Sequence, residues 1–149
     1  MHVVLVEPEI PQNTGSIARL CAATASELHL VGRLGFSLED RYLKRAGLDY
    51  WPHVRVRVHA TWDEYAAARP AGRLLGFSSH GRDSYTRIAF SPDDALVFGG
   101  ESKGLPDELR SDLAPLYRIP IETSAVRSLN LANAVSIVLY EGLRQLGRA

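Results

Sequence analysis

Three short segments gather the glycine and polar residues from which this chain could build a binding site. They are Asn13-Thr14-Gly15 together with Arg19, then Gly99–Pro106, and then Ile119–Asn130. Glycines let backbone amides and carbonyls approach a flat ring closely, which favours a site for a small molecule. Glycines that follow strands also serve turns alone, so spacing by itself leaves both interpretations open.

Several common catalytic motifs are absent from the sequence. Gly99 and Gly104 have the two-glycine spacing of a phosphate-binding loop, but Leu105 occupies the place of the Walker A lysine. No G-x-G-x-x-G follows the first expected strand, which argues against dinucleotide binding and against a Rossmann-type methyltransferase. The serines lack an evident neighbouring base, so nucleophilic catalysis has no support.

The histidines and the single cysteine give no sign of a metal centre. They show no metal-ligand spacing with one another, and we expect ordinary surface or half-buried histidines and no metal. The residues concerned are His2, His29, His53, His59, His80 and Cys21. One cysteine cannot form an internal disulfide, which fits a reducing compartment.

The composition is typical of a globular protein without a strong overall electrostatic field. The 149 residues suit one domain, 1–149, with 46% hydrophobic and 23% charged residues and a formal net charge of zero. Because the net charge is zero, the overall charge of the protein gives no indication of nucleic-acid binding. Lysines number only two among 17 basic residues, which reflects either genomic base composition or planar recognition of phosphate by arginine. Since neither a signal peptide nor a bilayer-spanning run is visible, we expect a cytoplasmic protein with no membrane partner.

Strand and helix patterns alternate along the chain and must position the three segments. Strands are predicted at 3–6, 28–31, 54–58, 74–77, 96–98 and 118–120, and a polar loop at 78–86. Helices are predicted at 37–47, 61–69 and from 106, besides the two discussed next. The fold class is therefore α/β, a mainly parallel sheet flanked by helices. The three segments follow strands, where α/β sheets bind their ligands.

Two helices carry most of the polar candidates. The first should be capped by Asn13 or Thr14, after a loop made extended by two prolines, and should end near Thr24. On it Arg19 lies two residues from Ile17, roughly 200° around the helix, and so points away from the apolar stripe. Cys21 falls on that stripe as a small buried hydrophobe.

The second helix covers 128–146 and is the longest apolar pattern in the chain. Its apolar residues recur every three or four positions, as on the buried face of a helix. They are Leu131, Val135, Val138, Leu139, Gly142 and Leu146. Ser128 and Asn130 are both good N-cap types.

The three segments together resemble the ordered motifs of the SpoU branch of the SPOUT methyltransferases. The similar stretches are NTGSIARLCAAT (13–24), FGGESKGLP (98–106) and IPI…RSLNLANAVSIVLYE (119–141). EPEIPQNTG and RAGLDYW (45–51) resemble more closely the minimal tRNA 2′-O-methyltransferases that act at the wobble nucleotide. Gly100 departs from the Pro or Asn that is common there, and Lys103 departs from Arg.

The resemblance implies a fold and a site that the residues alone do not. It implies a C-terminal trefoil knot (the SPOUT fold), a homodimer whose sites are completed by the second subunit, and S-adenosyl-L-methionine as cofactor. The implied cofactor contacts are Phe77, Gly99, Ile119, Ser128 and Leu129, and the implied catalytic residues are Arg19, Glu101 and Asn130. Because a guanidinium stays protonated, we expect Arg19 to stabilise the developing alkoxide or to anchor a phosphate that takes the proton.

The implied reaction is 2′-O-methylation of the wobble ribose, on cytidine or a modified uridine, in a subset of tRNAs such as leucine tRNAs. The alternatives are another tRNA or rRNA ribose, or a non-catalytic knotted RNA-binding dimer. The anticodon stem-loop would contact the basic residues Arg41, Lys44 and Arg45, although a solvated helix face explains them nearly as well. Tyr50 or Trp51 could stack on a splayed nucleotide, or could be core or dimer contacts.

Overall fold

The computed structural model describes residues 1–39, 41, 45 and 50–148, and within them the strands form one seven-stranded sheet. Its order is β3-β2-β1-β6-β4-β7-β5, and all six strand pairings are parallel. The strands are β1 (His2–Val6), β2 (Glu27–Val31), β3 (Arg55–His59), β4 (Leu74–Phe77), β5 (Asp83–Ser84), β6 (Ala95–Gly99) and β7 (Tyr117–Arg118). The expected class, α/β with a mainly parallel sheet, is confirmed.

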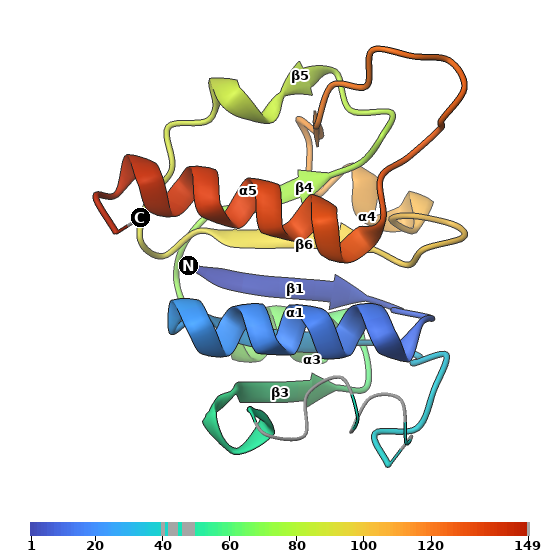
Figure 1. The fold of residues 1–149 in the computed structure, drawn as a ribbon, viewed down its shortest axis with the longest axis vertical. Helices are drawn as coiled ribbons and strands as arrows, with labels where there is room; N and C mark the ends of the chain where they lie inside the picture. The colour runs from blue at the N-terminus through green and yellow to red at the C-terminus, as the bar shows by residue number, and fades with distance from the viewer. Residues whose placement is uncertain (40, 42–44, 46–49, 149) are drawn as a thin grey trace.

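Helices cover both faces of this sheet. α1 (Pro11–Thr24) and α5 (Leu131–Gln145) lie side by side on one face, as Figure 1 shows, and α3 (Trp62–Ala68) lies behind the other. The short α4 (Asp107–Arg110) packs on the same side as α3. Alternate residues of each strand therefore enter one of two apolar clusters, a larger one under α1 and α5 and a smaller one under α3 and α4.

α1 begins earlier than the sequence suggested. The prediction that Asn13 or Thr14 caps it is wrong, because the helix starts at Pro11 and both residues are buried within its first turns. Proline suits this first helical position, since its fixed φ is already helical and its missing N–H would have had no partner there. The end at Thr24 and the buried Cys21 are as predicted. Burial raises the pKa of the Cys21 thiol to about 12.

α5 confirms the pattern from which it was predicted. Asn130, one of the two expected N-cap residues, accepts hydrogen bonds from the backbone N–H groups of Ala132 (2.9 Å) and Asn133 (3.3 Å). Val135, Val138 and Leu139 are completely buried. The first turn of α5 is therefore fixed by a side chain that also faces the candidate site.

Other boundaries differ in ways that follow from the sheet. β7 covers Tyr117–Arg118 rather than 118–120, because its short pairing is with Phe77 on one side and Asp83–Ser84 on the other. Those last two residues form β5 within the stretch expected to be a polar loop. Most of the helix expected at 37–47 lies outside the described residues. No helix in the described part of the chain is long and apolar enough to cross a membrane.

Candidate functional site

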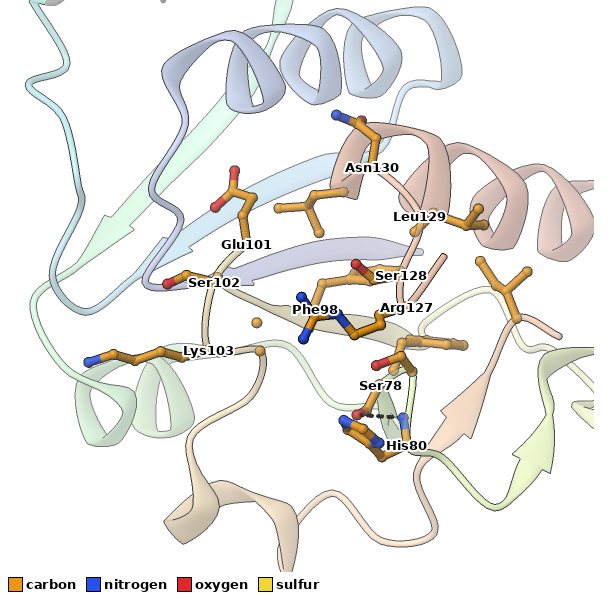
Figure 2. Close-up of a pocket in the computed structure, with 18 of the residues that line it drawn as sticks. Ser78, His80, Phe98, Glu101, Ser102, Lys103, Arg127, Ser128, Leu129 and Asn130 are labelled. Carbon is orange, nitrogen blue, oxygen red and sulfur yellow. Dashed lines mark hydrogen bonds between the residues drawn. The ribbon is translucent and has the colours of Figure 1, made fainter. Parts of the chain in front are cut away.

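A cavity of about 890 Å³ opens at the carboxyl ends of the central strands. Figure 2 shows side chains from several segments converging on it. Its lining comes from the ends of β4 and β6, the loop 99–104 and the segment 119–131, with contributions from α1 and α4. The residues that the resemblance implies as cofactor contacts all line it: Phe77, Gly99, Ile119, Ser128 and Leu129. Segments distant in sequence thus meet at one site, as predicted for the carboxyl edge of an α/β sheet.

The loop after β6 folds back tightly on the end of its own strand. The Gly104 N–H donates to the Gly100 carbonyl (2.9 Å), and Gly104 has a φ of +68°. A Cβ built on Gly99 would lie 2.0 Å from the Gly104 carbonyl carbon and 2.1 Å from the Leu105 nitrogen. Only glycine fits this crossing, so the sequence FGGESKGLP encodes a wall of closely packed backbone beside the cavity.

Beneath this loop the cavity has an aromatic floor. The rings of Phe77 and Phe98 stack with their centroids 4.9 Å apart and an interplanar angle of 15°, and Tyr117 is tilted against Phe77 at 6.1 Å. The two phenylalanines are adjacent across the β4–β6 pairing, which sets their spacing. A flat, apolar ligand group finds both a hydrophobic surface and nearby backbone polar groups here.

Glu101 ties the loop to the start of α1. Its carboxylate accepts hydrogen bonds from the backbone N–H groups of Glu9 (2.7 Å) and Ile10 (3.2 Å) and from the Asn13 side chain (3.0 Å). Ile10 is the N-cap residue of α1 and has no side-chain acceptor of its own. Glu101 therefore supplies a negative charge at the positive end of that helix, from 91 residues away along the chain.

Asn13 extends this connection to α5. Its side-chain oxygen accepts a hydrogen bond from the Asn130 side chain (2.9 Å), while its amide donates to Glu101. The predicted catalytic residues Glu101 and Asn130 thus meet through Asn13, a residue that sequence reasoning placed in the first segment but not among the site residues. Nothing in the spacing indicated this link, because Asn13 is 88 residues from one partner and 117 from the other.

A second set of hydrogen bonds joins loop 99–104 to the chain at the start of α1. Ser102 donates to the Glu9 carboxylate from its backbone N–H (3.1 Å) and from its hydroxyl (2.7 Å). The side-chain hydrogen bond from Ser102 lowers the pKa of Glu9. Loop 99–104 is therefore fixed to the chain before α1 at two neighbouring positions.

Arg19 lies elsewhere on α1. It is exposed, as its helix position predicted, and it is not among the described residues that line the cavity. Its Nη2 donates to the Tyr50 hydroxyl (3.1 Å), and its guanidinium carbon lies 4.6 Å from the centroid of the Tyr50 ring. Tyr50 thus contacts the guanidinium through both its hydroxyl and its ring face, and sequence reasoning missed this contact between residues 31 apart.

Basic groups occur near the cavity and away from it. Lys103, Arg110 and Arg127 line the cavity, and Figure 2 shows Arg127 extending toward its middle. Of the basic cluster expected to contact RNA, Arg41 and Arg45 are exposed, and Lys44 lies outside the described residues. Trp51, the other expected stacking residue, packs partly buried against the larger core cluster.

Replacing Glu101 by Gln should lower the stability of the free protein. The amide keeps one acceptor oxygen but loses the charge, and its NH2 group opposes N–H donors. We expect the free energy of unfolding to fall by about 1–2 kcal/mol in a denaturant titration. Asp112→Asn, the same change at an exposed position, should be neutral, and equal stability of the two variants would contradict the bridging role.

Comparison with known proteins adds independent findings. The sequence model of the SpoU rRNA Methylase family matches residues 1–140. A protein of Methylovorus glucosotrophus named tRNA (cytidine(34)-2′-O)-methyltransferase is 46% identical over 144 residues, which are 96% of this chain and 94% of that protein.

Solved structures agree with the sequence match. One, described as giving insights into the 2-OH methylation of C/U34 on tRNA, has a TM-score of 0.94 at 47% identity and covers 99% of this chain and 97% of its own. Another is the SpoU methyltransferase AviRb from Streptomyces viridochromogenes in complex with the cofactor AdoMet. Its TM-score is 0.87 at 27% identity, with 100% of this chain and 61% of that chain covered.

Proposed function

The chain belongs to the SpoU rRNA methylase family, and from that premise we propose that it is an S-adenosyl-L-methionine-dependent tRNA 2′-O-methyltransferase acting on the ribose of the wobble nucleotide. The observation that carries the proposal is the cavity at the end of β6, built from the same loops as the family motifs. The base is cytidine or a modified uridine, and the tRNAs are a subset such as the leucine tRNAs.

The residues around the cavity fit this cofactor. A flat purine can lie between the backbone wall after Gly99 and the apolar floor, with Leu129 and Ile119 at its edges. Because Gly99 lacks a Cβ, the backbone of Gly104 and Leu105 packs directly against the end of β6 and fixes the position of this wall. Once bound, S-adenosyl-L-methionine supplies an electrophilic methyl group on a sulfonium.

The part of the chain in methyl transfer is positioning and electrostatic stabilisation. Loop 99–104 and the start of α5 hold their geometry through Glu101, Asn13 and Asn130, which act as positioning residues rather than proton carriers. Arg19 stabilises negative charge on the ribose 2′-oxygen as its proton leaves, or anchors a phosphate that accepts that proton. A fixed cation is suited to this role, because guanidinium keeps its charge at any working pH.

A homodimer completes this arrangement. Arg19 lies outside the cavity of its own chain, so the arginine of a second copy is the one that reaches the reacting ribose. An exposed apolar strip on α5 supports such a partner, since Ile137 is 36% and Tyr140 48% exposed. The C-terminal trefoil knot belongs to the same proposal, because loop 99–104 and segment 119–130 are the parts that it would tie together.

The tRNA anticodon stem-loop would contact the exposed basic residues Arg41 and Arg45, together with Lys44, through its phosphates. The cationic lining of the cavity, Lys103 and Arg127, would meet the phosphates beside the target nucleotide. Because tRNA is the proposed substrate, we propose a cytoplasmic location for the protein.

The decisive experiment incubates the dimer with S-adenosyl-L-methionine carrying a labelled methyl group and with total tRNA, followed by nucleoside mapping. Label on the 2′-oxygen of nucleotide 34 is the expected result. Label on a base would overturn the proposed chemistry, and label on another ribose would replace the substrate. Cofactor binding without any transfer would favour a non-catalytic RNA-binding dimer.

Tyr50 offers a graded test of the role of Arg19. Tyr50→Phe removes the hydroxyl that accepts from Arg19 but keeps the ring beneath the guanidinium, so kcat should fall about fivefold, equivalent to ~1 kcal/mol. Tyr50→Ala removes both contacts and should cost more, with cofactor affinity unchanged in both variants. Tyr85→Phe is the matched control, and wild-type kcat in Tyr50→Ala would show that Arg19 needs no such support.

A further inference from the structure

A cluster of polar side chains lies at the opposite end of the sheet from the cavity. His2 begins β1 and Glu27 begins β2, and the two residues pair across the parallel ladder. His29 follows Glu27 by two residues and so shares its face of the sheet. Both histidines were expected to be ordinary surface or half-buried residues. His29 is instead only 1% exposed, because it lies on an interior strand beneath α3, where Tyr65 packs against it.

The ligand atoms of this cluster face one another. One atom from each of His2, Glu27 and His29 lies within 4.8 Å of the other two. His29 Nε2 is 3.5 Å from Glu27 Oε1, and His2 Nδ1 is 4.0 Å from Glu27 Oε2. In an ideal tetrahedral zinc site, bonds of ~2.0–2.2 Å place ligand atoms roughly 3.3–3.6 Å apart, so His29 and Glu27 already have a suitable separation and His2 must move closer to them.

Both ring nitrogens that face Glu27 lack a hydrogen-bond partner among the described residues. These are His2 Nδ1 and His29 Nε2, buried polar atoms whose hydrogen-bonding capacity is not used. The other nitrogen of His29, Nδ1, lies 3.0 Å from Nε2 of the buried His59. When His29 Nδ1–H donates to His59, the Nε2 lone pair points into the cluster, and metal-binding histidines typically donate their other ring N–H to an acceptor in this way.

One cation already competes for the carboxylate. Arg57, opposite His29 on β3, forms an ion pair with Glu27 Oε1 through its Nε. Its side chain is 60% exposed, so it can turn into solvent by breaking this ion pair. Glu27 is 8% exposed and would be left without this counter-charge, which a bound cation would replace.

We propose that His2, Glu27 and His29 form a binding site for one divalent transition-metal cation, for which Zn²⁺ is the probe. Two imidazole nitrogens and a carboxylate oxygen make a donor set that suits zinc and its neighbours rather than Mg²⁺ or Ca²⁺. The site joins β1 to β2 at their amino ends, far along the sheet from the methyl-transfer cavity, so its effect is on stability rather than on chemistry. It rests on the described side chains alone and stands independently of the proposed methylation.

The test is a Zn²⁺ titration of protein first stripped with a chelator, followed by calorimetry and by competition with a chromophoric chelator. We expect one Zn²⁺ per chain and a rise in melting temperature. His2→Gln and Glu27→Gln should each weaken binding at least about tenfold and abolish the thermal shift. His53→Gln, at an exposed histidine outside the cluster, is the control and should change neither quantity.

Arg57 provides a change in the opposite direction. Arg57→Gln removes the competing cation and should tighten Zn²⁺ binding several-fold, whereas Arg55→Gln, on the same strand, should have a smaller effect. Circular dichroism of each variant checks that it is folded, and His2, being only partly buried, gives the safest ligand variant. Binding that is undetectable, or that is unaffected by both His2→Gln and Glu27→Gln, would overturn the proposal.

Discussion

Arg19→Ala should abolish methyl transfer while leaving the fold and cofactor binding intact. The side chain is exposed, it contacts Tyr50, and it lies outside the cavity lining of its own chain. Its loss therefore costs little stability and removes no cofactor contact. Withdrawing one preorganised group from developing negative charge typically costs about 10²–10³ in kcat, and we expect a loss at the upper end of that range or beyond.

Single-turnover kinetics, calorimetry with S-adenosyl-L-methionine and thermal unfolding together separate these effects. Arg69→Ala, at the end of α3 on the other face of the sheet, should retain normal turnover. Arg19→Lys keeps the charge but loses the planar fork, and should fall between wild type and Arg19→Ala. Substantial activity in Arg19→Ala would refute the assigned role.

The second large effect is expected from Gly99→Ala. The added methyl group would lie 2.0–2.2 Å from backbone atoms of Gly104 and Leu105, which cannot move aside as a flexible side chain would. Either β6 or the loop must shift. We expect a loss of about 3 kcal/mol in the free energy of unfolding, together with cofactor affinity reduced below detection.

Gly147→Ala separates crowding from backbone strain. Gly147 has a φ of +66°, but a Cβ there meets nothing within 4 Å, so only the left-handed conformation is penalised, by roughly 1 kcal/mol. Denaturant unfolding of both variants, with cofactor calorimetry, makes the comparison. A Gly99→Ala protein as stable as Gly147→Ala, with cofactor affinity preserved, would mean that the loop is not the rigid wall described above.

Periodicity was sufficient to predict the fold class and the longest helix. The three- and four-residue spacing of Val135, Val138 and Leu139 reports burial directly, and Asn130 is a local cap that acts within three residues. The start of α1 was missed because its carboxylate partner, Glu101, lies 91 residues from Ile10. Proline at the first helical position was the available local signal, and it was interpreted as a helix breaker.

The candidate site was predictable to the level of segments but not of contacts. The rule that ligands bind at the carboxyl ends of parallel strands predicted that segments 99–106 and 119–130 meet at one cavity, but of the first segment Asn13 lines that cavity and Arg19 does not. Contacts such as Arg19 with Tyr50, or His29 with His59, depend on how distant strands and turns come to face one another. Motif spacing contains no information on them, because each pair is 30 or 31 residues apart.

The central place of β1 has a consequence for folding. β1 pairs with β2 (Glu27–Val31) on one edge and with β6 (Ala95–Gly99) on the other. The second pairing therefore joins β1 to a strand almost a hundred residues later in the chain. Until β6 pairs with this edge of β1, the residues Val3 to Leu5, which are completely buried in the folded protein, form an unpaired hydrophobic strand edge. Such long-range parallel pairing is slow to nucleate, and we expect refolding to be sluggish and prone to aggregation at high protein concentration.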